Sequence, residues 1–323
     1  MSDSERSTAT LLVMAGSALG VGALSAIQAR ANGSLALSVG SGLQAASVSF
    51  AVGLVVLTTI GLARRKVRHG LGLLRTAVRE GSQPAWIVAG GVSGGLFIAT
   101  QSLSVPVIGV ALYSVSLVGG QIASSLLVDA RGWGPRGRQA PTPARFAAAV
   151  LGLAAVVTAS GGRWDEGPAA IGWAALCVVT GAAVAWQQAA NGRVTAVART
   201  PIVAAWINFM LGGAIVATLW ALSVALGRVD AQPLPSGPPW IYVGGVIGAT
   251  FLAATAWAVG RIGVLAVTLL VTAGQLVGAL ALDYLLLDVV DGLLVAGTVL
   301  AFVAVTTGAI GHRWPGLRSR STS

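Results

Sequence analysis

Two short phrases, IQARANGS at residues 27–34 and WQQAANGR at residues 186–193, decide how this chain is organised. Each stands near the end of a long hydrophobic stretch and contains a glutamine followed four residues later by Asn-Gly. The amide pairs, which lie 159 positions apart, are Gln28 with Asn32 and Gln187 with Asn191. Because polar residues are scarce elsewhere, this repetition predicts two copies of one structural unit.

The composition predicts an all-α membrane protein. Of 323 residues, 55% are hydrophobic and 9% are charged, whereas soluble domains carry about 25% charged residues. A water-soluble fold of this size could not bury so much apolar surface, so lipid must be the solvent for most of it. Apolar runs of about 20 residues predict ten membrane-spanning helices. They are residues 10–31, 42–63, 85–104, 107–128, 145–161, 168–190, 202–226, 240–259, 262–286 and 291–311.

The repeat extends well beyond the opening phrases. At an offset of 159, Gly22 matches Gly181 and Phe50 matches Phe209. After one gap the offset becomes 154, which aligns several glycines and the phrases around Gln121 and Gln275. The chain is therefore predicted to be a duplicated five-helix unit, with copies at 1–162 and 163–323. The first helix recurs inside the chain, which argues against a cleaved signal peptide.

The distribution of Lys and Arg predicts how the two copies sit in the membrane. Since five is odd, the second copy must enter from the opposite side, which makes the repeats inverted. Placing both termini, the 64–83 loop and the 129–144 loop in the cytoplasm puts 17 of 20 basic residues inside. The net charge of +10 is thereby assigned to membrane loops rather than to nucleic-acid binding. The predicted location is the plasma (inner) membrane.

Two five-helix halves, each with a QxxxNG phrase and a later GQ…D phrase, resemble the drug/metabolite transporter superfamily. The chain is most similar to its YdcZ-like branch of inner-membrane exporters. The resemblance implies a ten-helix basket, a central substrate cavity and alternating access. It implies a secondary transporter for a small metabolite or drug. We further expect no cofactor, and a monomer or homodimer. A uniporter, an importer or a channel-like facilitator of a small neutral solute is the alternative.

The repeated amides have two interpretations. Their i, i+4 spacing places each pair on one helical face, near the outer end of the first helix and the inner end of the sixth. Gln28, Asn32, Gln187 and Asn191 are then gate residues at the two mouths of the pathway. Alternatively, Asn-Gly is a left-handed helix stop, and the glutamine bonds to the loop.

Gln121 and Gln275 are the leading candidates for substrate binding. Each is predicted about two-thirds of the way through its span and follows a glycine, which allows a neighbouring helix to approach. A buried amide needs a partner, which is either substrate or another helix. Further polar or aromatic candidates within the spans are Asn208, Gln101, Tyr113, Trp186, Trp206 and Trp257.

Charged residues are predicted to be absent from the middle of every span. Asp129 and Asp283 come closest, either as proton-sensitive gate residues or as helix ends in contact with water. In the second case both tolerate substitution by asparagine, and transport does not depend on protons. No cluster for catalysis or metal binding is evident, so an enzyme is not expected. An uncharged lining of amides and aromatics suits a neutral, zwitterionic or weakly cationic solute.

Overall fold

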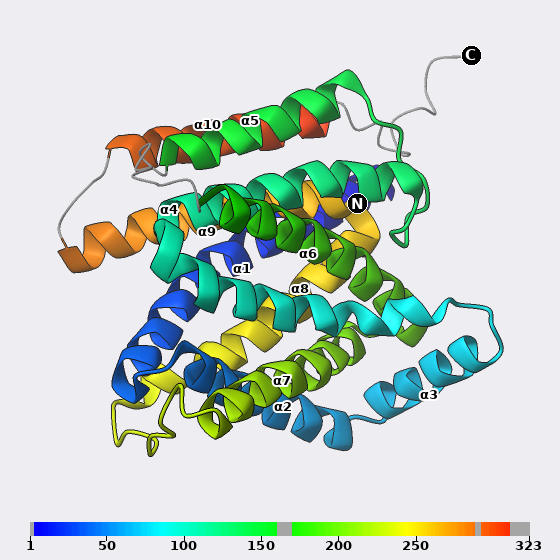
Figure 1. The fold of residues 1–323 in the computed structure, drawn as a ribbon. Helices are drawn as coiled ribbons and strands as arrows, with labels where there is room; N and C mark the ends of the chain where they lie inside the picture. The colour runs from blue at the N-terminus through cyan, green and yellow to red at the C-terminus, as the bar shows by residue number, and fades with distance from the viewer. Residues whose placement is uncertain (1–2, 160–169, 288–291, 311–323) are drawn as a thin grey trace, which may run out of the picture.

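The computed structural model describes residues 3–159, 170–287 and 292–310, which form a bundle of helices without a strand among them (Figure 1). The first half comprises α1 Asp3–Val39, α2 Gly42–Ala63, α3 Arg65–Arg79, the 3-10 helix η1 Ala85–Ala89, α4 Gly90–Arg131 and α5 Pro143–Ala159. The second comprises α6 Ala170–Ala198, α7 Pro201–Ala225, the 3-10 helix η2 Pro239–Tyr242, α8 Gly244–Ile262, α9 Val264–Leu287 and α10 Gly292–Ile310. The boundary predicted between residues 162 and 163 lies outside the described residues.

Five helical segments are long and apolar enough to cross a membrane, among the residues that the structure describes. They are Gly42–Ala63, Ile171–Ala198, Pro201–Ala225, Pro239–Ile262 and Val264–Leu282. Shorter apolar helical segments lie at Ala85–Gln101, Pro143–Thr158 and Val295–Gly308. Large apolar side chains such as Leu37, Val55 and Ile171 are exposed on the outside of the bundle. Such an exterior is suited to lipid rather than to water.

The Asn-Gly phrases do not end their helices, which corrects the interpretation as helix stops. α1 continues through Asn32 to Val39, and Gly40, with φ +64°, ends it. α6 likewise continues to Ala198, before Arg199 with φ 54°. A glycine inside a helix costs about 1 kcal/mol relative to alanine. The buried side chains that follow, including Leu35 and Val39 of α1, outweigh that cost.

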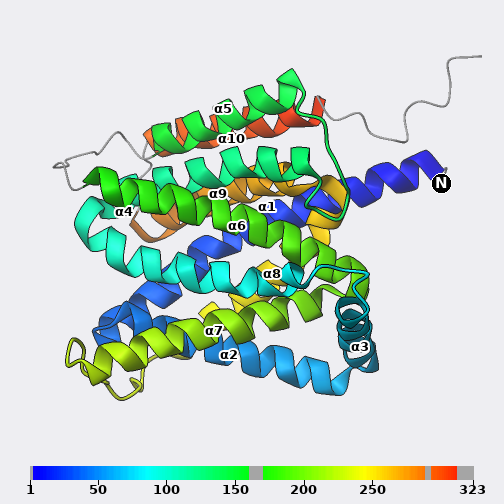
Figure 2. The same ribbon diagram turned by 45° about the vertical axis from the view of Figure 1, so that its right-hand side comes forward.

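A helix, α3, occupies most of the segment that was predicted to be the 64–83 loop. Val67, Gly70 and Leu74 repeat every three or four residues and form its buried face. Val67 and Leu74 pack into a cluster with Val194 of α6 and other apolar residues of α6 and α7. The high density of arginine concealed this periodicity at the level of sequence. Figure 2 shows α3 at one end of the bundle, crossing the direction of α2 and α7.

The third and fourth predicted spans form one helix, α4, which doubles back on itself in both views (Figures 1 and 2). Pro106 is part of this helix, and a proline inside a helix removes a hydrogen bond and kinks the chain. The equivalent joint in the second half separates α8 from α9 at Gly263, whose φ is +88°. Two different local solutions therefore produce the same change of direction.

Helices of the two halves contact one another in corresponding ways. α2 lies against α7 and α5 against α10, while α1 packs on α8 and α9 and α6 packs on α4. The closest approaches use glycines at equivalent positions. A Cβ on Gly22 would overlap the carbonyl oxygen of Val271, and a Cβ on Gly181 would overlap that of Leu117. Each contact maps onto the other under the sequence offsets of 159 and 154.

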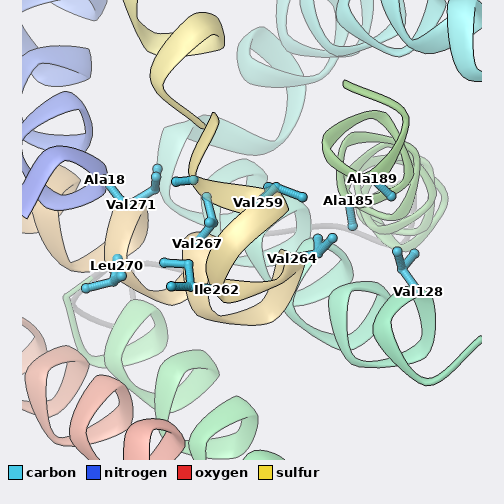
Figure 3. Close-up of a cluster of buried hydrophobic side chains, with 11 residues drawn as sticks. Ala18, Val128, Ala185, Ala189, Val259, Ile262, Val264, Val267, Leu270 and Val271 are labelled. Atoms are coloured by element: carbon cyan, nitrogen blue, oxygen red, sulfur yellow. The ribbon is translucent and has the colours of Figure 1, made fainter. Parts of the chain in front are cut away.

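The largest apolar cluster lies where α1, α4 and α6 meet the α8–α9 joint (Figure 3). It combines small residues of α6, Ala185 and Ala189, with branched residues of α8 and α9 such as Val259 and Val264. Because this cluster unites helices of both halves, the α8–α9 joint is held by packing from several directions.

Candidate functional site

Three amides form a buried network between α6 and α7, here named the α6–α7 amide cluster. Gln187 and Asn191 lie one turn apart on α6, and Asn208 faces them from α7. The Gln187 Nε2 donates to Asn208 Oδ1 over 2.5 Å. The Asn208 Nδ2 donates to Asn191 Oδ1 over 2.5 Å and to the Ala204 carbonyl over 2.9 Å. All three amide side chains are buried, so the cluster is a buried polar network whose members bond to one another.

Glycines of the opposite half cover this cluster. A Cβ on Gly90 would lie 3.1 Å from Asn191 Oδ1, and one on Gly94 would lie 3.4 Å from Gln187 Nε2. A Cβ on Gly91, between them, would lie 3.0 Å from the Asn208 Cα. The first arm of α4 approaches the amides closely because it carries hydrogen atoms where other residues carry side chains. Gly90, Gly91 and Gly94 therefore form one of the close contacts between the two halves.

An equivalent site, the α1–α2 polar cluster, consists of Gln28 and Asn32 on α1 and Ser49 on α2. It packs on α8 of the other half. A Cβ on Gly244 would overlap Asn32 Oδ1, and one on Gly248 would lie 2.9 Å from Gln28 Nε2. The predicted amide pairs thus occupy corresponding places. The pair on α1 contacts α8, and the pair on α6 contacts the first arm of α4.

The two clusters differ in how completely they are bonded. Ser49 stands where the second half has Asn208, and a serine hydroxyl is too short to bridge two amides. The buried Oδ1 of Asn32 has no hydrogen-bond partner. An unsatisfied buried acceptor costs about 1–3 kcal/mol. The α1–α2 polar cluster is therefore the less stable of the two contacts in this conformation.

Asp129 is buried, which corrects the expectation of a helix end in water. Its Oδ2 lies 2.5 Å from the guanidinium of Arg145 at the start of α5. The backbone N–H groups of Val264 and Leu265 donate to the carboxylate over 3.0 Å and 3.2 Å. Asp129 therefore caps the N-terminus of α9, where the helix dipole favours a negative charge. The carboxylate joins the end of α4 to the opposite half.

Gln121 and Gln275 are both half-buried. Neither amide makes a hydrogen bond within the described part of the chain. The preceding glycines bring helices together, since a Cβ on Gly120 would overlap the carbonyl oxygen of Val178 and one on Gly274 that of Leu19. The two glutamines lie beside these helix crossings, and their amides make no hydrogen bond to the described residues.

A further polar line, which sequence reasoning missed, connects α4, α6 and α9. Ser125 and Thr268 share a hydrogen bond of 2.9 Å, and Thr268 donates to Gln188 Oε1 over 3.3 Å. All three side chains are buried. The signal was present in the doubled glutamine of WQQAANGR, because the second glutamine of the phrase points to a different face of α6 from the first.

The remaining predicted residues do not gather at one place. The Trp206 Nε1 donates to Thr58 Oγ1 over 3.0 Å. Trp186 packs against Trp86, with ring centroids 5.5 Å apart and ring planes tilted by 35°. The other three predicted residues have different surroundings. Tyr113 is buried in an apolar cluster, Trp257 lies 4.5 Å below the guanidinium of Arg261, and Gln101 is exposed.

Asp283, the counterpart of Asp129, lies on α9, and its side chain is outside the described part of the structure. Among the described residues, no group of His, Cys, Asp and Glu side chains is arranged to hold a metal ion. The candidate site thus consists of amides, hydroxyls and one buried ion pair.

Comparisons with known proteins bear on the family and the fold. The family model described as "Putative inner membrane exporter, YdcZ" matches residues 13–158 and 172–311, in two segments that correspond to the two copies. A solved structure titled "Crystal structure of protein" is similar over 93% of this chain and 98% of its own, with a TM-score of 0.66 and 21% sequence identity. At that identity the similarity concerns the fold alone. No curated protein matches the chain.

Proposed function

The chain belongs to the YdcZ family of inner-membrane exporters, and from that premise we propose that it is a secondary transporter working by alternating access. In this proposal ten spans form two inverted five-helix repeats in the plasma membrane, with both termini in the cytoplasm. The cargo is a small organic solute that is neutral, zwitterionic or weakly cationic, because the residues predicted to bind it are amides and aromatic rings. Export is the direction that the family indicates.

The observation that carries the proposal is the reciprocal packing of the two polar clusters. The α6–α7 amide cluster packs on the glycines of α4, and the α1–α2 polar cluster packs on the glycines of α8. Two similar contacts between the same two halves allow the halves to rock, with one contact tightening as the other loosens. Such a molecule has two states of comparable free energy, which a carrier requires.

The bonding pattern favours a conformation closed toward the cytoplasm. The predicted topology places the α6–α7 amide cluster and Asp129 on the cytoplasmic side. The amides of the α6–α7 cluster satisfy one another through Asn208 while packing on the glycines of α4, and Asp129 bonds to the α9 N-terminus of the opposite half. On the predicted outer side, Asn32 Oδ1 remains without a partner. A carrier open to the outside would show this asymmetry.

The proposed substrate contacts are Gln121 and Gln275. They lie at equivalent positions in the two halves, and a primary amide can both donate to and accept from a small polar solute. Within the proposal, the half-buried state of both side chains and the absence of a partner among the described residues favour substrate binding over helix association. The α6–α7 amide cluster serves as a gate, since its amides already satisfy one another.

The experiment begins with a thermal-shift screen of the purified protein against metabolites and drugs. Each hit is then tested in proteoliposomes that are preloaded with unlabelled compound and supplied with a radiolabelled trace outside. A carrier produces transient accumulation of label above equilibrium and a rate that saturates. A channel-like facilitator produces neither, so equilibration without counterflow would contradict the proposal. The Gly33→Ala variant is a control for a harmless substitution and should transport like the native protein, because a Cβ at Gly33 meets no atom within 4 Å.

A further inference from the structure

One strongly basic surface takes no part in the proposed transport path. α3 and the residue before it carry six exposed basic side chains: Arg64, Arg65, Lys66, Arg68, Arg75 and Arg79. No acidic residue occurs between residues 64 and 79. With 3.6 residues per turn, Arg68, Arg75 and Arg79 share one face, with Arg65 at its edge. These four arginines are named the α3 basic stripe.

The opposite face of α3 is fastened to the bundle. Val67 and Leu74 are buried, and a Cβ on Gly70 would overlap the carbonyl oxygen of Ala198 at the end of α6. This attachment holds the helix in place and turns the basic stripe outward. The guanidinium of Arg68 also donates to the carbonyl of Leu62 at the end of α2. The stripe is therefore part of a rigid element rather than of a mobile loop.

Apolar side chains border the stripe. Leu71 on α3 is 40% exposed, and Leu62 on the adjoining turn of α2 is 70% exposed. A helix that combines exposed leucine with a row of arginines is typical of an element lying in the interface between headgroups and acyl chains. Figure 2 places α3 across the end of the bundle, where a helix parallel to the membrane surface would lie.

Among the described residues, the second half has no such element. Its equivalent connection at residues 226–238 is a turn and extended chain with Arg228 as its only basic residue. The fold thus closes this connection without a helix or a basic stripe. A basic helix at this connection in one copy and not in the other indicates a role on one side of the membrane.

We infer that the α3 basic stripe binds the headgroups of anionic phospholipids in the cytoplasmic leaflet. Arginine forms paired hydrogen bonds with phosphate oxygens, and the cytoplasmic leaflet supplies a negative surface that attracts basic segments. The bound headgroups hold α3 at the interface while Leu62 and Leu71 enter the acyl region. This interaction depends on a bilayer and is independent of transport.

The test places a fluorophore beside the stripe, on the exposed Thr76, through Thr76→Cys in a Cys177→Ala background. The full-length protein is reconstituted in phosphatidylcholine vesicles that contain a small fraction of nitroxide-labelled phosphatidylglycerol. A parallel sample contains the same fraction of nitroxide-labelled phosphatidylcholine. Phosphatidylglycerol should quench with an apparent affinity at least about fivefold higher, the factor expected from one engaged arginine. About 1 M salt, where the Debye length is about 3 Å, should abolish this preference.

Matched variants separate charge at this site from charge in general. Arg75→Gln with Arg79→Gln should remove the preference, whereas Arg75→Lys with Arg79→Lys should retain it. Arg131→Gln with Arg138→Gln removes the same charge from exposed positions elsewhere and should leave the preference unchanged. Equal quenching by the two lipids with the native stripe would overturn the inference. So would a preference that persists in the double glutamine variant, or α3 binding to an oligonucleotide without any lipid preference.

Discussion

The carboxylate of Asp129 lies 2.5 Å from the guanidinium of Arg145, and both side chains are buried. The same carboxylate accepts two backbone hydrogen bonds from the start of α9. A residue at the end of α4 thus holds a helix of the opposite half. This arrangement changes what substitution at Asp129 should do.

Asp129→Asn should lower the stability of the folded protein. The change leaves the charge of Arg145 buried without its partner, which costs about 3–5 kcal/mol. The melting temperature in detergent should fall clearly relative to Asp230→Asn, a control at an exposed aspartate. Combining Asp129→Asn with Arg145→Gln should recover part of the loss, because the unpaired charge is removed. Equal melting temperatures for the two single variants would contradict the role of Asp129 in holding Arg145 and the start of α9.

Ser49→Asn should stabilise the contact between α1, α2 and α8. The second half accommodates asparagine at the equivalent position, where Asn208 bridges two amides. An asparagine at residue 49 would supply the partner that Asn32 Oδ1 lacks. We expect a higher melting temperature and a slower transport rate, because one conformation is favoured over the other. Ser47→Asn, on the same helix, is the control. Faster transport by Ser49→Asn would count against reciprocal gating.

Gly245→Ala should be severe, since the new Cβ would overlap the carbonyl oxygen of Ser49. Separating α8 from α2 by even part of an ångström disrupts the close packing there. Gly20→Ala and Gly33→Ala are matched controls in helix interiors, with no atom within 4 Å of the new Cβ. They should be neutral or stabilising by about 0.4–1 kcal/mol. Expression and gel-filtration profiles of the three variants check this ordering.

Gln121→Ala and Gln275→Ala should impair transport while leaving the folded protein near its normal yield. Both amides are half-buried and make no hydrogen bond within the described residues, so their removal breaks no contact in the protein. The measurement is transport per unit of folded protein in proteoliposomes. Reduced yield with unchanged specific activity would instead indicate that the glutamines hold helices together.

The topology predicts that Ser82 faces the cytoplasm. In a Cys177→Ala background, Ser82→Cys should resist a membrane-impermeant thiol reagent in intact cells and react after permeabilisation. Ser236→Cys, in the equivalent connection of the second half, should react from outside without permeabilisation. Both positions are exposed, so neither result depends on burial. Labelling of Ser82→Cys from outside would refute the inverted arrangement.

The sequence by itself determined the helical class, the membrane environment and the correspondence between the two copies. These properties depend on local composition and on spacing, which a single chain displays directly. The alignment of Gly22 with Gly181 was sufficient to anticipate equivalent roles, and the structure places both against carbonyl oxygens of the other half. The family followed from the same ordered phrases, and the matching family model confirms it.

Tertiary structure alone decided where the helices end and what the polar residues contact. Asn32 and Gly33 resemble a helix stop, but burial of Leu35 and Val39 beyond them carries α1 onward. Helix α3 was hidden because its charges dominate the composition, while packing on α6 acts through only a few residues. Asp129 bonds to Val264, and Asn32 lies against Gly244, each more than a hundred residues away. Gln187 bonds to Asn208 on the next helix. Such pairings depend on how the two halves interlock in space, and a linear sequence does not contain that geometry.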